Sequence, residues 1–558
     1  MACSSSFDVE DAEEPFALPE FPEPPPADGG ADTEGEAGTE GATGGTLRVA
    51  LARDPVTLDP RFLADDEGEV IVSALFEPLV RLDDQSRIVP AAASQWAVSD
   101  AGATFTFRLR EAQFHDGTPV TAEDFRRTFD RIADGTAEPR SYLDYLLADV
   151  VGMHDSLVNG VPLRGVEVVD ARTLRIRLDQ PQPGFLTRLA DPSLVPTPPA
   201  AEEFPEQFAA QPVGNGPFMM AGAREPGSFV RLAAAPTYDG APHLDEVLFT
   251  VYEGDTSREA QWADLTDGQL HVAQVPVQRR AEAAERFGVS TDGYTGPGRL
   301  DGVTSGVYLY GFDTTRPPFD DPRARRAVSM AIDRRHLADD VLQGTRQAAT
   351  SIVPPPVPGS QPGVCEHCLY DPEGAAALFE EVRADRGDEL DDAAFATVTL
   401  THSRGAIHTA IAEQIADDLD AALGVEVRFR ALQLEDFVRV VRDGGAAVFR
   451  IGWDVGTADF GDYLTPLFHS ANLDGENTTR FADEQVDSTL DSAKHAAAPQ
   501  ARATLYRSAE RQILEAAPAI PLLWYRHEFV VTPEVEGLRL SPWGRLDLTS
   551  ARLDPPGP

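Results

Sequence analysis

Alternating hydrophobic and polar positions are clearest in residues 102–135, where they predict a strand followed by a turn. Phe105, Phe107 and Leu109 alternate with polar side chains, which is the two-residue period of a strand with one buried face. Residues 115–119 read His-Asp-Gly-Thr-Pro and predict a turn, because glycine accepts a positive φ and proline fixes its own φ.

The helix that follows this turn is predicted from its cap and its apolar face. Thr121 takes the N-cap position, and Asp124 lies three residues later, which is the spacing of a capping box. Phe125, Phe129 and Ile132 fall at i, i+4 and i+7 and form one apolar stripe. The pattern alone therefore predicts an amphipathic helix next to a strand in a globular domain.

The same two periods recur along the rest of the chain. Residues 46–51 alternate as a strand, and residues 164–178 predict two short strands. Asp321 before Pro322 predicts the start of a helix, because aspartate caps free N–H groups and proline has none to leave unsatisfied. A chain of 558 residues that mixes strands and helices predicts an α/β or mixed α+β fold with several domains or lobes.

Composition excludes some classes of protein. Hydrophobic residues make up 42% of the chain, and no run of eighteen apolar residues is present, so the sequence predicts no transmembrane helix. The formal net charge of −45 argues against nucleic acid as a partner, because phosphate binding requires clustered cations.

Lys494 is the single lysine, so 46 of the 47 cationic residues are arginine. Two compatible interpretations are a high-GC genome and a salt-adapted acidic surface.

The first 45 residues differ from the rest. Cys3 follows Ala2 and precedes serines, an arrangement that resembles the lipid-bearing end of a mature bacterial lipoprotein, with Met1 added as a start. The alternative is a chance cysteine in a disordered tail. Residues 7–45 contain twelve Asp and Glu and no Lys or Arg, so we expect a disordered, extended tether between a membrane anchor and the folded body.

Several motifs carry a resemblance to one family. They are residues 57–60 (TLDP), 75–80 (LFEPLV), 104–125 (TFTFRLREAQFHDGTPVTAEDF), 213–218 (VGNGPF), 318–334 (PFDDPRARRAVSMAIDR), 452–453 (GW) and 518–525 (PAIPLLWY). Together they resemble the family 5 extracellular solute-binding proteins, which serve peptide, nickel and opine ABC importers and include oligopeptide- and dipeptide-binding proteins. The resemblance covers about residues 46–550.

The resemblance implies a two-lobed periplasmic-binding-protein-like fold with an extra domain inserted in the first lobe, the arrangement called cluster C. Such lobes close around a ligand by bending at a few extended residues, here near 305 and 525. The implied division, with residues 1–45 as the tether, is first lobe 46–62, 180–305 and 525–558, extra domain 63–179, and second lobe 306–524.

The resemblance also points to residues that line the cleft. Peptide-binding members place an aspartate three residues after the tryptophan of the GW motif, where it binds the α-amino group of the ligand. Here Gly456 occupies that position after Trp453, so Asp454 or Asp459 is the candidate replacement. In the alternative interpretation Trp453 belongs to the core and both aspartates are solvated.

Three further residues are candidates for the cleft wall. Tyr308 and Tyr310 begin the second lobe, and aromatic rings with a polar tip suit ligand walls, although ordinary strand packing explains them nearly as well. Asp54 precedes the TLDP motif and either faces the cleft from the first lobe or lies in a surface loop. His402 and His408 are six residues apart, a poor spacing for one helical face, and are predicted to be solvated.

Cys365 and Cys368 form a C-x-x-C motif with His367 between them. A disulfide is favoured because an exported chain lies in an oxidising compartment. A metal site requires more ligands than His367 supplies, and a redox catalyst requires a strand-then-helix setting that the flanking prolines disfavour.

The predicted function is a substrate-binding lipoprotein, held at the outer face of the cell membrane, that captures a solute and delivers it to an ABC permease. Oligopeptides are the favoured cargo; a sugar or other neutral solute, nickel and haem are alternatives. An extracellular hydrolase is disfavoured because the motifs G-x-S-x-G and H-E-x-x-H are absent. We therefore predict a binding protein without enzymatic activity. We also predict that it is a monomer and has no cofactor or resident metal.

Overall fold

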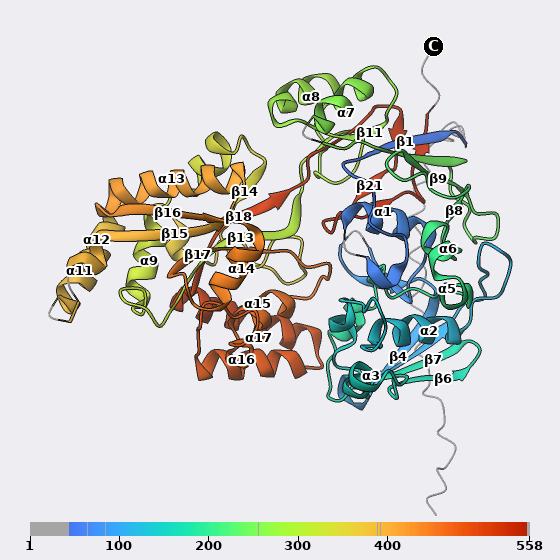
Figure 1. The fold of residues 1–558 in the computed structure, drawn as a ribbon, viewed down its shortest axis with the longest axis horizontal. Helices are drawn as coiled ribbons and strands as arrows, with labels where there is room; N and C mark the ends of the chain where they lie inside the picture. The colour runs from blue at the N-terminus through green and yellow to red at the C-terminus, as the bar shows by residue number, and fades with distance from the viewer. Residues whose placement is uncertain are drawn as a thin grey trace, which may run out of the picture.

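The computed structural model describes residues 44–63, 65–83, 85–254, 256–387, 389–390 and 392–554. These residues form two lobes side by side, each built on a large β-sheet, with a smaller sheet attached to the first lobe (Figure 1). The predicted lipid-bearing Cys3, and the tether up to residue 43, lie outside the described residues. In the part of the chain described, no helix is long and apolar enough to cross a membrane.

The first lobe contains a seven-stranded mixed sheet. Its strands, in spatial order, are β12 (Gly298–Leu300), β19 (Phe529–Val531), β11 (Val272–Gln274), β1 (Thr46–Leu51), β10 (Glu246–Val251), β9 (Phe229–Ala234) and β8 (Phe218–Met220). The predicted strand at 46–51 is confirmed as β1, which pairs in parallel with β10. Helices α1 (Asp66–Leu75), α7 (Ser257–Thr266) and α8 (Arg280–Phe287) belong to this lobe.

The second lobe contains a six-stranded sheet with helices on both faces. In spatial order its strands are β14 (Arg346–Ala348), β18 (Ala519–Arg526), β13 (Val303–Phe312), β17 (Val448–Trp453), β15 (Thr397–Ser403) and β16 (Glu426–Leu432). One face packs on α9 (Pro322–Ala331), α11 (Pro372–Arg386) and α13 (Ala406–Leu423). The other packs on α15 (Gly461–Phe468), α16 (Glu484–His495) and α17 (Pro499–Ala516). Another helix of this lobe, α14 (Leu434–Arg442), contributes to a smaller cluster with β17.

The smaller sheet contains the segment that the sequence predicted most clearly. Its order is β4 (Ala93–Ser99), β5 (Thr104–Leu109), β7 (Thr173–Arg177) and β6 (Val166–Asp170). The predicted strand and helix are confirmed as β5 and α2 (Ala122–Ala133). The capping box is also confirmed, because the backbone N–H of Thr121 donates to the Asp124 carboxylate at 2.8 Å.

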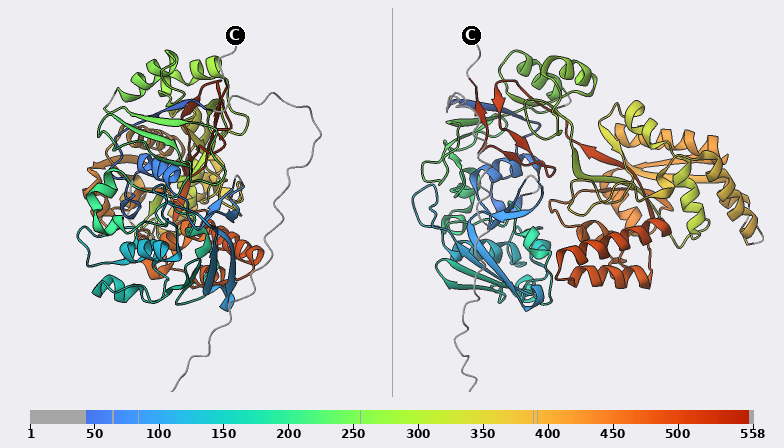
Figure 2. Two further views of the ribbon diagram at one scale, coloured as in Figure 1. Left: turned by 90° about the vertical axis from the view of Figure 1, so that its right-hand side faces the viewer. Right: turned by 180° about the vertical axis from the view of Figure 1, so that it is seen from behind.

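The chain passes between the two large sheets twice. Only two residues separate β12 from β13, and two separate β18 from β19. These connections run side by side at the narrow junction between the lobes (Figures 1 and 2). Two short extended connections are the arrangement that allows lobes to rotate about a hinge.

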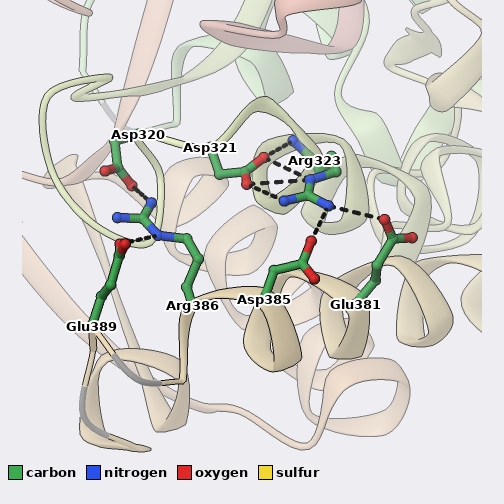
Figure 3. A network of polar contacts seen from close by, with 7 residues as sticks. All are labelled: Asp320, Asp321, Arg323, Glu381, Asp385, Arg386 and Glu389. Carbon is green, nitrogen blue, oxygen red and sulfur yellow. Dashed lines mark hydrogen bonds and ion pairs between the residues drawn. The ribbon is translucent and has the colours of Figure 1, made fainter.

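The predicted start of α9 is confirmed and is tied to α11 by a network of ion pairs. Asp321 caps the helix by accepting the backbone N–H of Arg323 at 2.8 Å. The Arg323 guanidinium also lies 2.9 Å from Glu381 and 2.7 Å from Asp385, and Arg386 lies 2.5 Å from Asp320 (Figure 3). Two arginines thus form ion pairs with several surface carboxylates of a strongly acidic chain. These ion pairs lower the local repulsion between the carboxylates.

Candidate functional site: the cleft between the lobes

A cavity of about 470 Å³ lies between the lobes, beside the two connections. The first lobe contributes residues of β1, α1 and β19, and the second contributes the segments around residues 304–305 and 454–456. A third wall comes from the turn between two short C-terminal strands, β21 (Arg539–Leu540) and β22 (Leu546–Asp547). Cavities of this size commonly hold small molecules.

Carboxylates from both lobes meet on one side of this cavity. Asp66 and Glu69 come from the first turn of α1, and Asp454 comes directly after β17. The local sequence explains α1, because Asp65 caps it by accepting the Gly68 N–H at 2.9 Å and acidic residues stabilise the positive end of a helix. We call Asp66, Glu69 and Asp454 the acidic pole.

Two carboxylates of the acidic pole, Glu69 and Asp454, have raised pKa values. Burial raises the pKa of Glu69 to about 7, and the charges of Asp191, Asp66 and Asp454 add to the shift against the opposing effect of Arg545. Burial likewise raises the pKa of Asp454, although the Ser305 hydroxyl donates to its carboxylate at 2.6 Å and opposes the shift. Asp454 is open to the water of the cleft yet surrounded by protein on most sides, so its desolvation is partial. A cation placed here would relieve this repulsion.

Arginines from both lobes line the side of the cavity nearest the connections. Arg258 lies 2.6 Å and Arg346 3.9 Å from Glu528, so one carboxylate is shared between two guanidinium groups. Arg526 lies 3.2 Å from Asp301, and the Arg346 guanidinium stacks over the Tyr525 ring at 4.8 Å. The cavity is therefore polarised, with acidic and basic groups on different walls.

Asp454 and Gly456 are the two predicted residues that line this cavity. Trp453 lies next to them, but its indole N–H donates to the Asp462 carbonyl at 3.0 Å and its ring packs against a core cluster. Asp459 is buried, lies 2.5 Å from Arg502, and accepts the Gly461 N–H at 2.7 Å. Of the two aspartates considered as replacements at Gly456, Asp454 therefore faces the cleft.

The other predicted wall residues do not line the cavity. Tyr308 and Tyr310 are 2% and 1% exposed, and they belong to the core under α9 and α13. Asp54 lies 3.8 Å from Arg224, in the first lobe. The prediction that His402 and His408 are solvated is wrong for His402, which is 1% exposed on β15, and His408 packs with its ring 5.7 Å from that of Tyr308.

Arg450 is a residue near the cleft that the sequence did not single out. Its guanidinium stacks over the Tyr308 ring at 5.4 Å and donates to the Ser403 hydroxyl at 3.3 Å. Within the described residues, no carboxylate forms an ion pair with it, and its buried Nε atom has no hydrogen-bond partner. The positive charge of Arg450 contributes to a lowered pKa of His408, about 4, after the larger effect of burial. An uncompensated guanidinium beside Tyr525, which lines the cavity, favours an anion.

The C-terminal turn connects the two lobes across the cavity. The indole N–H of Trp543 donates to the Thr457 carbonyl at 3.1 Å, and Arg545 donates to the Gly456 carbonyl at 3.1 Å. Arg545 also donates to the Ala190 carbonyl of the first lobe at 3.2 Å. Thus the segment after the GW motif is positioned from the opposite lobe.

The sequence model of the bacterial extracellular solute-binding proteins, family 5 (middle), matches residues 87–475, which is more than half of the chain. The chain belongs to this family. It is therefore a solute-binding protein and not an enzyme, and the sequence-based assignment is confirmed.

Several relatives are similar to this chain over most of their length. The probable deoxycholate-binding periplasmic protein YgiS of Escherichia coli K12 is 28% identical over 503 residues, covering 87% of this chain and 89% of that protein. The dipeptide-binding protein DppE of Bacillus subtilis 168 is 26% identical over 541 residues, covering 93% and 95%. The glutathione-binding protein GsiB of Salmonella typhimurium is 26% identical over 487 residues, covering 85% and 88%.

Solved structures of other binding proteins share the fold. The murein tripeptide-binding protein MppA, in its unliganded open form, superposes with a TM-score of 0.79 at 24% identity, covering 92% of this chain and 99% of that one. HbpA2 from Haemophilus parasuis gives a TM-score of 0.79 at 24% identity, covering 91% and 100%. The predicted two-lobed periplasmic-binding-protein fold is thus confirmed.

Proposed function

We propose that this family 5 protein captures short peptides in the inter-lobe cavity and hands them to an ABC importer. The observation that carries the proposal is the polarised cavity, with carboxylates of both lobes on one wall and arginines on another. A free peptide carries an ammonium group at one end and a carboxylate at the other, so its charges complement those of the cavity.

In this proposal, Asp454 takes the role that Gly456 does not fill. Its carboxylate faces the cavity, whereas Asp459 is held by Arg502. Glu69 approaches the same ammonium from the first lobe, so the bound cation would contact both lobes and favour their closure. The carboxylate of the peptide is assigned to the arginine wall and to nearby Arg450, which forms no ion pair with any residue that the structure describes.

The cargo class is tested by calorimetry with Ala-Ala-Ala and its N-acetylated form. We expect the free peptide to bind at least about tenfold more tightly, because an unpaired buried charge costs more than 1.4 kcal/mol, a factor of ten in affinity. Asp454→Asn should remove this preference. Equal affinity for both peptides would contradict recognition of the amine, and binding of neither would favour a sugar, another neutral solute or a metal cargo.

The anchoring and assembly are part of the same proposal. A lipid on Cys3 and the acidic segment up to residue 45 would hold the body near the outer face of the membrane, where closure presents both lobes to the permease. The protein would act as a monomer. Its first lobe, inserted domain and second lobe would follow the division that the family resemblance implies, except that α1 packs with the first-lobe sheet. Mass spectrometry of protein from a native host would detect the lipid on Cys3.

A further inference from the structure

A second cavity, of about 640 Å³, lies on the other side of the C-terminal turn from the cleft. Its walls come from the end of α1, the hairpin of β2 (Val80–Leu82) and β3 (Ile88–Pro90), the loop between β9 and β10, and the turn between β21 and β22. It is larger than the inter-lobe cavity and is separate from the function proposed above.

Aromatic rings and prolines form part of the wall of the second cavity. Trp543, Tyr238 and Phe76 supply aromatic rings. Four prolines, whose backbone is restrained by the ring, also line it: Pro78, Pro192, Pro217 and Pro542. A preformed wall of this kind suits a rigid ligand, because neither partner loses much conformational freedom on binding.

Two of the three carboxylates at this cavity are neutralised by the protein itself. Glu77 forms an ion pair with Arg110 and accepts the Tyr238 hydroxyl at 3.1 Å. Asp83 lies 2.7 Å from Arg87. The third, Asp547, is exposed at the rim, where it accepts the backbone N–H of Thr549 at 3.0 Å.

Two of the arginines at this cavity form ion pairs with carboxylates, and Arg81 does not. Arg539 lies 3.5 Å from Asp292, and Arg545 lies 3.8 Å from both Glu69 and Asp191. Arg81 forms no ion pair with any residue that the structure describes, and it is near enough to Tyr238 to act on the charge of its hydroxyl. An exposed guanidinium without an ion pair, next to aromatic rings and prolines, favours a ligand that carries one anionic group.

We propose that the second cavity is a binding site for a rigid, apolar molecule with a single anionic group, such as a polycyclic carboxylate. The rings would pack against Trp543 and the prolines, and the anionic group would contact Arg81. Neither the family assignment nor the inter-lobe cleft requires such a site.

Trp543 links this site to the cleft. It lines both cavities and donates to the Thr457 carbonyl of the second lobe. A ligand packed under Trp543 supports the turn in the position that holds the second lobe. By linkage, cargo and this ligand must then change each other's affinity by the same factor.

The experiment uses 1-pyrenebutyrate, a rigid fluorescent carboxylate, and 1-pyrenebutanol as its neutral counterpart. We expect saturable 1:1 binding of pyrenebutyrate to the whole protein, and weaker binding of the alcohol. Arg81→Gln should weaken pyrenebutyrate about three- to tenfold and leave the alcohol unchanged.

Two matched phenylalanine substitutions locate the site. Ala241→Phe adds a ring at the second cavity, and Ala52→Phe adds the same ring at the inter-lobe cavity. We expect Ala241→Phe to weaken pyrenebutyrate at least tenfold and Ala52→Phe to change it less than twofold, with both variants retaining their melting temperatures. If Ala241→Phe unfolds the protein, Arg81→Gln still decides the proposal.

Three results would overturn the proposal: no saturable binding, equal binding by Arg81→Gln and wild type, or loss of binding on Ala52→Phe alone. Simple competition between Ala-Ala-Ala and pyrenebutyrate would also overturn it, because the second cavity would then belong to the cargo cleft. The pyrenebutyrate measurements do not depend on peptide binding. The second site and the proposed peptide-binding function can therefore be disproved independently.

Discussion

The carboxylate of Asp459 lies 2.5 Å from the guanidinium of Arg502, and both side chains are largely buried. This pair decides between the two aspartates near Gly456, because a carboxylate committed to Arg502 does not face the cleft. The sequence alone did not decide which aspartate replaces Gly456, since Asp454 and Asp459 lie at similar distances from it along the chain.

Asp459→Asn is therefore expected to destabilise the fold rather than to abolish binding directly. It leaves the Arg502 charge buried without its partner, which costs about 3 kcal/mol. Urea denaturation measures the loss, and Asp459→Asn with Arg502→Gln should restore part of it. The matched variant Asp454→Asn should lose peptide affinity with little change in stability; the reverse pattern would show that Asp459 is the amine ligand.

Peptide affinity is expected to increase as the pH rises from 6 to 8. Burial raises the pKa of Glu69 from 4.5 to about 7, so the empty cleft holds a proton there at pH 6 that a bound ammonium would displace. Ionisation of Glu69 alone would raise the affinity about tenfold over this interval, because only the ionised carboxylate attracts the cation. About half of the α-amino groups of the peptide lose their proton by pH 8, so the net gain is about fivefold.

The pH dependence is checked by calorimetry at several pH values, with Glu69→Gln as the test variant. The variant should bind more weakly at pH 8 and show a flatter profile. Because a raised carboxyl pKa lowers folding stability as pH rises through 4.5 to 7, Glu69→Gln should also gain relative stability over that range. A wild-type affinity that falls between pH 6 and 8 would contradict the role of Glu69.

Arg450 is expected to recognise the carboxyl end of the cargo. It has no ion-pair partner among the described residues and lies beside Tyr525 at the cavity. Replacing the free carboxylate of Ala-Ala-Ala by an amide should weaken binding about tenfold, and Arg450→Gln should remove the difference between the two peptides. Arg428→Gln, which removes a guanidinium of the same lobe that is paired with Glu426 at 3.0 Å and does not line the cavity, is the control. A difference that persists in Arg450→Gln would place the carboxylate elsewhere.

The strand β5, the capping box of α2 and the capped start of α9 were predictable, because each depends on residues close together in the chain. The acidic pole was not predictable from the sequence, because folding brings Glu69 and Asp454 together from different lobes. Arg450 was missed because a cation without an ion pair is recognised only when its neighbours are known. His402 was misjudged because helical spacing was applied to a residue that lies on β15.

Cys365 and Cys368 are bonded to each other in the structure, and we expect the same in exported protein. The bond closes a loop of four residues, for which the chain-entropy relation gives a stabilisation of about 2 kcal/mol. The double variant Cys365→Ser, Cys368→Ser should lose about this amount in urea denaturation. Thiol labelling without reductant should detect neither sulfur; two labelled thiols would reopen a metal site with the buried His367.

Removing the first 43 residues is expected to leave folding unchanged. Residues 7–45 carry twelve acidic residues and no Lys or Arg, so they repel a body that is itself strongly acidic, and they offer little apolar surface to bury. A protein that begins at Gly44 retains the whole of β1, whose first residue is Thr46. Its melting temperature should lie within about two degrees of that of the full chain, because each kcal/mol of lost stability shifts the midpoint by a few degrees in a protein of this size. Repeating the comparison at high salt separates charge from packing: a deficit of many degrees that salt does not remove would mean that the segment packs against the body.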